Sequence, residues 1–256
     1  MIHISSLHKS FGKQKVLQGI SLNFNKPGIT AILGPNGSGK TTLIKSILGM
    51  VLPTAGHIHF EEKDIKGQWD YRSRIDYLPQ IARFPDNLRV DELLRMIQDI
   101  RSVAPASLDR LIALFDMADY MNKRFGNLSG GTKQKANLIQ AFMYDSPVII
   151  LDEPTNGLDP VALIRLKTLL QEEKQKGKLI LITTHIMSFV NEMADDVVFL
   201  LDGNVHYRGS VDALKIQFGE QDLEKAIAGI LLGKSAFSSN GHSAHNEVIK
   251  VKTTLH

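Results

Sequence analysis

The stretch that most constrains this chain is residues 34–42, whose sequence G-P-N-G-S-G-K-T-T fits the pattern G-x-x-x-x-G-K-[ST]. Glycines lack a Cβ, so the backbone can bend tightly and point consecutive N–H groups at a phosphate chain. A lysine adds a full charge at the β- and γ-phosphates, and the hydroxyl that follows it can ligand Mg²⁺. The predicted phosphate-binding residues are Gly34, Asn36, Gly37, Ser38, Gly39, Lys40, Thr41 and Thr42.

The segments on either side supply the context that such a loop needs. Residues 29–33 (I-T-A-I-L) form a short apolar run typical of a buried strand. Residues 43–48 continue as a helix with one apolar side, whose positive dipole end would face the same phosphates. A glycine-rich turn that fits the pattern by accident would lack this strand–loop–helix order. The loop is therefore predicted to be a nucleotide site.

The composition is ordinary for a globular protein. The chain has 256 residues, of which 43% are hydrophobic and 22% charged, enough for a large core. A formal charge of +3 is too small to indicate a nucleic-acid surface, and the lack of cysteine excludes disulfides and thiolate metal sites. No apolar run approaches the ~20 residues of a spanning helix, and no N-terminal signal is visible. We therefore expect any membrane role to depend on a partner.

Hydrophobic periodicity predicts two kinds of strand. Residues 2–4 and 20–24 alternate apolar and polar side chains, which indicates half-exposed, antiparallel strands. Residues 148–151 and 179–182 are wholly apolar and are joined through a helix, which indicates a parallel sheet. Residues 197–207 form a predicted hairpin.

Residues from about 87 to 121 and from 133 to 144 carry a helical pattern instead. Asp91 and Ser107 are the predicted N-caps of helices in the first of these stretches.

The apolar run at residues 148–151 ends in two acids, Asp152 and Glu153. Beside a phosphate loop, the aspartate is expected to hold the Mg²⁺ shell and the glutamate to polarise the attacking water. The alternative is a buried strand that ends in surface carboxylates, and the phosphate loop upstream argues against it.

A second anion cradle is predicted at Ser129, Gly130 and Gly131, which begin another helix. Two cradles for one triphosphate suggest a site that closes between two subunits. Standing alone, this motif would be explained as an ordinary serine N-cap after a loop.

Together these motifs resemble those of ATP-binding cassette (ABC) ATPases, over roughly residues 1–215. Leu128–Lys135 (L-S-G-G-T-K-Q-K) resembles the signature sequence of that family. Gln80 resembles the Q-loop glutamine, Asp159 the D-loop aspartate and His185 the switch histidine. Phe11 stands where the family carries an aromatic ring that stacks on adenine.

The resemblance implies an α/β fold, a P-loop NTPase core with a mostly parallel sheet. An N-terminal antiparallel β subdomain and an inserted α-helical subdomain at about residues 82–140 would complete a nucleotide-binding domain of residues 1–215. Residues 216–256 would form a short C-terminal extension, partly mobile over the Ser/Gly/His stretch 235–245.

The resemblance also implies an activity: an ATPase subunit of a transporter that binds ATP and Mg²⁺ and drives a separate integral membrane permease. The subunit would work as a homodimer or with a second cassette subunit, without a nucleic-acid partner, in the cytoplasm at the inner face of the cell membrane. The implied catalytic residues are Glu153, His185, Gln80 and Lys40. Nucleotide contacts come from Phe11, the phosphate loop, Ser129, Gly130, Gly131 and Asp159, and metal contacts from Thr41, Gln80 and Asp152.

Three departures from the family pattern stand out. Thr132 replaces the usual glutamine of the signature, Phe11 replaces the more frequent tyrosine, and Asn156-Gly157 replace the more frequent small residues before Leu158-Asp159. None of these changes removes a group that performs the chemistry, so the site is expected to be active.

Two other interpretations stay open at this point. Soluble ABC ATPases of translation or DNA repair carry two cassettes or a long coiled-coil insertion, whereas the span from Gln80 to Leu128 fits only a small helical subdomain. A non-hydrolysing ATP-binding module would be expected to lack Glu153 and His185.

The signature with Thr132 and the sequence N-G-L-D-P at residues 156–160 are similar to those of cassettes paired with exporter-type (ABC-2) membrane subunits. Within that group the chain is loosely similar to the ATPase subunit that supports maturation of the copper sites of nitrous oxide reductase. No residue identifies the cargo.

His57 and His59 share one face of a strand and could bind a metal together. No third ligand is apparent in the sequence, so an exposed strand face is the favoured interpretation.

Overall fold

The alternating N-terminal residues form an antiparallel sheet in the computed structural model, which describes residues 1–232. Its strands, in the order β2-β1-β4-β5, are β2 (Gln14–Phe24), β1 (Ile2–Phe11), β4 (Ala55–Phe60) and β5 (Lys63–Asp64). In β1, Ile4 lies opposite Leu22 on one side and Ile58 on the other, and all three side chains are buried. The predicted antiparallel strands are confirmed.

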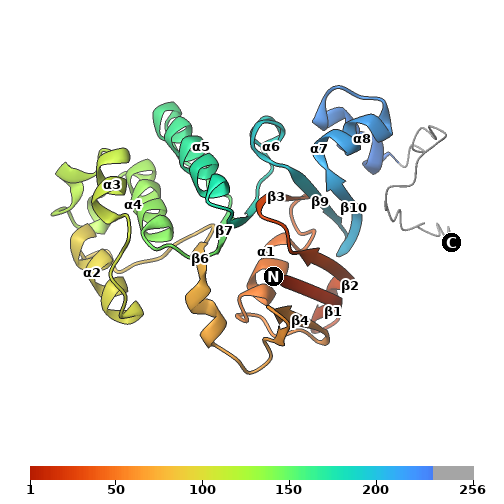
Figure 1. Cartoon of the computed structure of the whole chain (residues 1–256), viewed down its shortest axis with the longest axis horizontal. Helices are drawn as coiled ribbons and strands as arrows, with labels where there is room; N and C mark the ends of the chain where they lie inside the picture. Colours follow the sequence, from red (N-terminus) through yellow and green to blue (C-terminus); the bar gives the residue numbers. More distant parts are fainter. Residues whose placement is uncertain (233–256) are drawn as a thin grey trace.

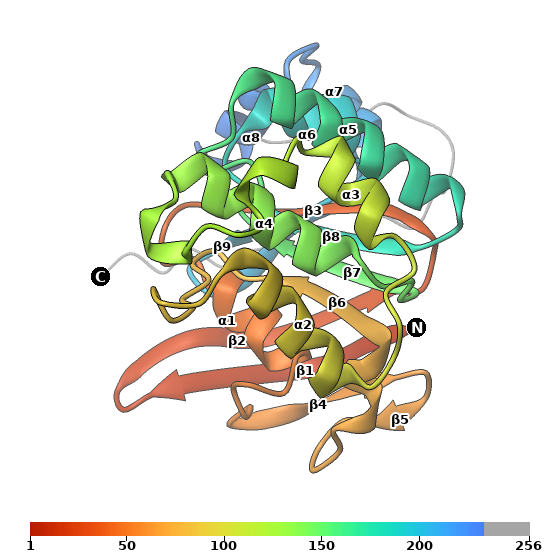
Figure 2. The ribbon, with the colours of Figure 1, turned by 90° about the vertical axis from the view of Figure 1, so that its left-hand side faces the viewer.

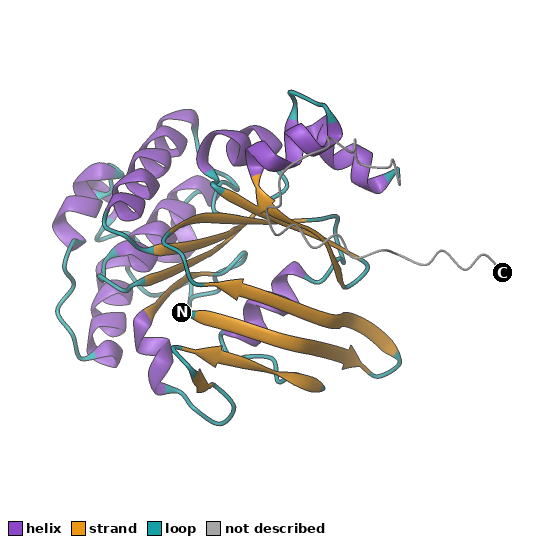
Figure 3. Ribbon diagram, turned by 45° about the vertical axis from the view of Figure 1, so that its right-hand side comes forward, coloured by secondary structure: helices purple, strands orange, loops and turns teal. Residues whose placement is uncertain are grey.

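The wholly apolar runs form a second, six-stranded sheet in the order β10-β9-β3-β8-β7-β6. Its strands are β10 (Asn204–Ser210), β9 (Asp196–Leu201), β3 (Gly28–Leu33), β8 (Leu179–Thr183), β7 (Val148–Asp152) and β6 (Ile75–Leu78). Every neighbouring pair is parallel except the β9–β10 hairpin. Both sheets and the helices around them are visible in Figure 1 and Figure 3, and the predicted mostly parallel α/β fold is confirmed.

Because the parallel strands are buried on both faces, each face of this sheet meets a different partner. Val148 and Ile150 of β7 pack towards the antiparallel sheet and helix α1 (Lys40–Ile47). Ile149 and Leu151 pack on the opposite side, against α4 (Gly130–Phe142) and α5 (Pro160–Gln175). Figure 2 shows the resulting layers, with helices above the parallel sheet and the antiparallel sheet below it.

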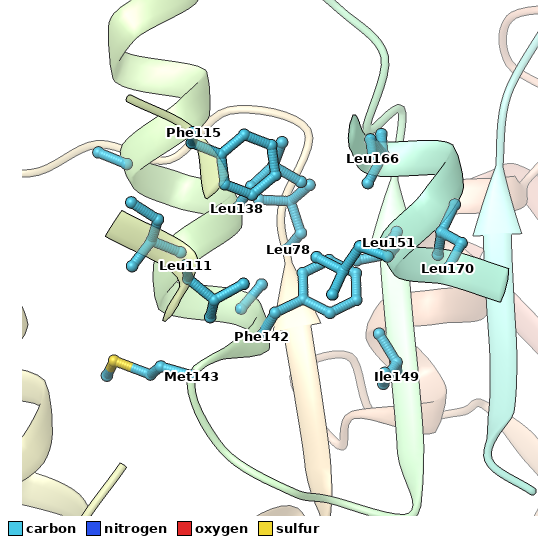
Figure 4. Close-up of a cluster of buried hydrophobic side chains, with 14 of the residues drawn as sticks. Leu78, Leu111, Phe115, Leu138, Phe142, Met143, Ile149, Leu151, Leu166 and Leu170 are labelled. Carbon is cyan, nitrogen blue, oxygen red and sulfur yellow. The ribbon is translucent and has the colours of Figure 1, made fainter. Parts of the chain in front are cut away.

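Three helices lie between β6 and β7 in the sequence: α2 (Val90–Arg101), α3 (Leu108–Leu114) and α4. Short 3₁₀ turns at Asp70–Arg74, Ala118–Tyr120 and Phe125–Asn127 connect neighbouring elements. Phe115, Leu138 and Phe142 lie in the buried cluster that joins these helices to the sheet (Figure 4).

The other end of the sheet is covered by α6 (Met187–Met193), α7 (Val211–Phe218) and α8 (Leu223–Leu231). Leu214 and Ala226 pack with Phe199 of β9 in a separate cluster, so the last helices belong to the folded part of the chain. The stretch 235–245, predicted to be mobile, lies outside the described residues. Within residues 1–232 no helix has the length and apolar character needed to cross a membrane.

One helix start differs from the prediction. Helix α2 begins at Val90, with Arg89 at the N-cap, so the prediction of Asp91 as the cap is wrong. The Glu92 side chain instead accepts a hydrogen bond from the Arg89 N–H at 2.9 Å, and Asp91 pairs with Arg95 one turn later. Ser107 does occupy the N-cap position of α3, although its side chain makes no capping hydrogen bond.

We expect Phe115→Ala to lower the free energy of unfolding by about 3–5 kcal/mol, because the ring is fully buried and its removal leaves a cavity. The matched control is Ile100→Ala on α2, where the side chain is 75% exposed and the loss should stay below about 0.5 kcal/mol. Urea unfolding of the two variants makes the comparison. Equal effects would contradict the packing described for α3 and α4.

Candidate functional site

The phosphate loop connects β3 to α1, and two of its glycines are required by close approaches. A Cβ on Gly34 (φ 149°) would lie 2.1 Å from the Leu200 carbonyl oxygen of β9. A Cβ on Gly39 (φ 105°) would lie 2.9 Å from the Val16 carbonyl oxygen of β2. Strand neighbours on both sides therefore fix the path of the loop, which only glycine allows at these points.

Inside the loop, polar groups converge where a phosphate chain would lie. Lys40 Nζ donates hydrogen bonds to the carbonyl oxygens of Gly34, at 2.7 Å, and Pro35, at 3.1 Å. Burial lowers the pKa of the Lys40 ammonium, and the charges of Glu153 and Asp152 oppose this shift. The buried Ser38 hydroxyl has no hydrogen-bond partner among the described residues. A buried hydroxyl without a partner in such a loop fits a phosphate oxygen as its missing hydrogen-bond partner.

Next to the loop, Asp152 lies at the end of β7 and is almost completely buried. Thr41 Oγ1 donates to its Oδ2 at 3.2 Å, and the Thr183 hydroxyl at the end of β8 donates to its Oδ1. Burial, together with the charge of Asp152, raises the pKa of Tyr77 to about 12. A hydroxyl and a carboxylate in contact beside a phosphate loop are the oxygen ligands that Mg²⁺ prefers.

Glu153 follows directly in a left-handed backbone conformation, with φ at 53°. Its N–H donates to the Thr183 carbonyl oxygen at 3.0 Å, which holds this unusual turn at the end of β7. His185 Nδ1 lies 3.0 Å from Glu153 Oε2 and 3.1 Å from Oε1. The carboxylate is buried whereas the imidazole is 65% exposed, so the pair lies at the surface of the site.

Two further predicted residues lie at the rim of the site. Gln80 follows β6, which runs parallel to β7 with Leu78 opposite Leu151, so the exposed Gln80 leaves the sheet at the same edge as Asp152. Phe11 ends β1, 51% exposed, with Lys9 Nζ 4.7 Å from its ring centroid. One face of the ring thus has a cation over it.

The second cradle lies at the start of α4 and faces outwards. Ser129 is the N-cap, and its Oγ accepts a hydrogen bond from the Thr132 N–H at 3.2 Å. Ser129 and Gly130 are exposed, and no atom lies within 4 Å of the Cβ position of Gly130. Thr132 Oγ1 lies 2.8 Å from Ser129 Oγ, so the departure from the family pattern makes a contact within its own cradle.

Behind the cradle, α4 contacts the loop that follows Glu153. Lys135 Nζ lies 2.7 Å from Asp159 Oδ2, and Asp159 Oδ1 accepts from the Ala162 N–H at 2.8 Å as the N-cap of α5. A hydrogen bond from Lys135 holds the pKa of Asp159 below its ordinary value. Asp159 is thus held by two contacts within its own chain, with its side chain 49% exposed, and its predicted contact with nucleotide stays a prediction.

Two more contacts tighten this junction. Gln134 Nε2 donates to the Pro154 carbonyl oxygen at 3.1 Å. A Cβ on Gly131 would lie 2.7 Å from the Gly157 carbonyl oxygen, so the backbones of cradle and loop touch directly.

The structure brings the predicted residues into two groups. The phosphate loop, Asp152, Glu153 and His185 form one group, and Ser129, Gly130 and Gly131 form the other. Sequence reasoning missed the contacts of Thr183 with Asp152, of Gln134 with Pro154 and of Lys135 with Asp159. The signals that could have indicated them are the polar residues Gln134 and Lys135 at the end of the signature and Thr183 at the end of an apolar strand.

The histidine pair on the antiparallel sheet has other partners. His57 Nδ1 lies 2.8 Å from Asp64 Oδ2, and the His57 and His59 ring centroids are 6.2 Å apart. Among residues 1–232, no three histidine, aspartate or glutamate side chains form a group that could hold a metal ion.

A large open hollow lies elsewhere. The two sheets are joined where the Gln18 N–H donates to the Gly203 carbonyl oxygen at 2.8 Å. An open groove of about 1120 Å³, lined by both polar and apolar groups, runs along the edges of β2 and β10, and none of the predicted site residues lines it.

Comparison with known proteins agrees with this geometry. A family model described as ABC transporter matches residues 17–156. The ABC transporter ATP-binding protein NatA of Bacillus subtilis is 32% identical, with 84% of this chain and 92% of that protein covered. The lantibiotic transport ATP-binding protein SrtF of Streptococcus pyogenes is 29% identical over 91% of this chain and 98% of its own length. The bacitracin transport ATP-binding protein BcrA of Bacillus licheniformis is also 29% identical, over the whole chain and 86% of its own length.

The fold has matching solved structures. The ATP-binding subunit of an ABC transporter superposes with a TM-score of 0.83 at 28% identity, covering 90% of this chain and 99% of that chain. A nucleotide-free ATP-binding cassette gives a TM-score of 0.72 at 25% identity, covering 91% and 95%.

We expect Lys40→Ala to weaken ATP binding by about 1.5–3 kcal/mol, because the ammonium contacts phosphate before and during the reaction. Thr41→Ala should weaken binding only in the presence of Mg²⁺, and excess Mg²⁺ should partly restore it. Titration with ATP, with and without Mg²⁺, measures both effects. Unchanged binding in Lys40→Ala would contradict the assignment of the loop.

Proposed function

Since this chain belongs to the ABC transporter family as an ATP-binding, ATP-hydrolysing subunit, we propose that two copies close around two MgATP molecules and drive a membrane permease. Each site would take its phosphate loop from one copy and its second cradle from the other. A second cassette subunit could take the place of one copy.

The observation that carries this proposal is the outward direction of the second cradle. Lys40 and the unpartnered Ser38 hydroxyl of the phosphate loop would bind one side of a phosphate chain. Ser129 and Gly130 are exposed, with open space in front of Gly130. A cradle that faces solvent binds the γ-phosphate held by another subunit, and closure then excludes water from both faces of the nucleotide.

Within each site we assign roles from the contacts. Mg²⁺ would supply charge stabilisation for the transferred phosphoryl group, with Thr41 and Asp152 as its protein ligands and Gln80 reaching it from the end of β6. Glu153 is the general base, because its buried carboxylate stands at the edge of the site with His185 against it. His185 orients that carboxylate, and Lys40 neutralises charge on the β- and γ-phosphates.

Phe11 supplies a stacking face for the base. Phe11 is the last residue of β1, at the turn of the β1–β2 hairpin, and β2 contacts the phosphate loop at Gly39. A stacking ring accepts any planar base, so adenine can bind here without hydrogen bonds that recognise its edge.

The permease would dock on α2. Met96 and Ile100 lie one turn apart on its exposed side, 38% and 75% exposed, and Val103 continues the line past the helix end. Ile81, beside Gln80, is 69% exposed as well. Apolar side chains spaced by one turn fit an amphipathic helix of a partner, and an intracellular helix of a permease would hold the subunit at the inner face of the cell membrane.

The relatives support export as the direction. Two of them are named for transport of a lantibiotic and of bacitracin, and this agrees with an ABC-2 exporter partner. The cargo itself would contact the permease and not this chain. The looser similarity to the nitrous oxide reductase maturation subunit stays a prediction. The alternative, a soluble ABC ATPase of translation or DNA repair, is not favoured.

We expect Glu153→Gln to abolish turnover and leave ATP binding intact, because the amide keeps the size of the side chain without its basicity. Loss of a general base costs ~10²–10⁴ in rate, or about 3–5 kcal/mol. The variant should accumulate as an ATP-bound dimer on size exclusion. Hydrolysis at the parental rate would mean that another residue is the base.

We expect Ser129→Arg to bind ATP normally as a monomer, since the phosphate loop and Phe11 are intact, but to block closure and hydrolysis. A mixture of Ser129→Arg with Lys40→Ala should regain low activity, because one composite site then contains an intact loop and an intact cradle. ATPase assays of the two variants, alone and mixed, provide the measurement. An equal loss of monomer affinity in both variants would overturn the two-subunit site.

A further inference from the structure

A buried ion pair joins β6 to the C-terminal end of α2, and neither of its residues is among the predicted site residues, although β6 also leads to Gln80. Asp76 of β6 has a side chain only 2% exposed, on the sheet face that carries Leu78 towards α4. Arg101, the last residue of α2, places Nη1 2.7 Å from Asp76 Oδ1. Ionised groups at such a place need several partners to remain there.

Those partners come from three segments. Arg101 Nη2 donates to the Ile75 carbonyl oxygen at 3.0 Å, and the guanidinium lies 4.3 Å from the ring centroid of Tyr144. The Ser146 N–H donates to Asp76 Oδ2 at 3.3 Å. The pair therefore connects three segments in one polar cluster: the C-terminal end of α2, the edge strand β6 and the connection from α4 to β7. We call it the Asp76–Arg101 cluster.

Stability alone gives little reason for this arrangement. Burial raises the pKa of Asp76, while the Arg101 charge and the Ser146 amide oppose the shift. Apolar residues of the same size usually stabilise a core as well as a buried ion pair does. What an ion pair with several directed hydrogen bonds adds is a single orientation of the segments that it joins.

That orientation matters because α4 runs from the second cradle to the Asp76–Arg101 cluster. The helix has 13 residues, so it spans ~20 Å from the cradle at Gly130 to its end at Phe142. If α4 tilted by about 10° at the Asp76–Arg101 cluster, the cradle would move by ~3–4 Å over that length. Such a shift exceeds the range of a hydrogen bond to a phosphate.

We propose that Arg101 and Asp76 are positioning residues for ATP hydrolysis, which hold the far end of α4 so that Ser129–Gly131 meets the phosphate of the second subunit. The proposal rests on the two-subunit site described above. Neither residue touches the nucleotide, so the pair acts on closure and turnover and not on binding to the monomer.

The experiment replaces the pair by apolar residues of similar size, in the double variant Asp76→Leu/Arg101→Met, which leaves no buried charge unpaired. Arg101→Lys keeps the positive charge but cannot donate from two guanidinium nitrogens to Asp76 and to the Ile75 carbonyl oxygen at once. Arg95→Met is the matched control, because Arg95 forms an exposed pair with Asp91 on the same helix. ATP affinity and stoichiometry of the monomer, the turnover number, and ATP-induced dimerisation in the Glu153→Gln background are measured for each variant.

The double variant should bind ATP within about twofold of the parent, at one site per chain, and lose at least about tenfold in turnover and in dimerisation. The turnover and dimerisation of Arg101→Lys should lie between those of the parent and the double variant, and Arg95→Met should match the parent. Parental dimerisation and turnover in the double variant would overturn the proposal. A proportional loss of ATP stoichiometry and turnover would overturn it too, because it would show a folding defect only.

The mixing experiment with Ser129→Arg and Lys40→Ala separates this proposal from its premise. If that mixture regains activity while the double variant behaves like the parent, the two-subunit site holds and the positioning pair fails. If the mixture stays inactive, the premise itself fails.

Discussion

The parallel register of four strands is the constraint on which the site depends. Strands β3, β8, β7 and β6 run in one direction, so their carboxyl ends open at a single edge. The phosphate loop leaves from β3, Asp152 ends β7 and Thr183 ends β8. Residues more than 100 positions apart in the chain thus become hydrogen-bonded neighbours, as Thr41 and Asp152 are. Ligand sites of parallel α/β sheets characteristically form at this edge.

Much of this arrangement could be predicted because its signals are local. The phosphate loop, the two acids after an apolar strand, and the serine and glycines at a helix start each lie within one short segment. Hydrophobic alternation likewise identified β1 and β2, since side chains of a strand point to opposite faces in turn. The start of α2 could not be predicted in the same way. Arg89 and Glu92 form the cap there, and Asp91, although of a type that often caps helices, lies two residues beyond the N-cap.

The contacts that orient the site depend instead on tertiary structure. Lys135 and Asp159 are 24 positions apart by their numbers and meet only because α4 packs beside the start of α5. Asp76, Arg101 and Ser146 come from three elements, and a charge in a strand pattern says nothing of its partner. Helix α4 is consequently fixed at both ends by polar contacts, while its middle is held by apolar packing. The polar contacts at its ends set the orientation of α4, and the apolar packing of its middle supplies most of its stability.

The hydrogen bonds of Lys40 have a consequence for how the nucleotide enters. The Lys40 ammonium donates hydrogen bonds to two carbonyl groups of its own loop, those of Gly34 and Pro35. An incoming phosphate must therefore exchange partners with the lysine, so the affinity reflects a difference between two sets of contacts. In return, the internal contacts keep the loop near its working shape, and little ordering entropy is lost when the ligand arrives.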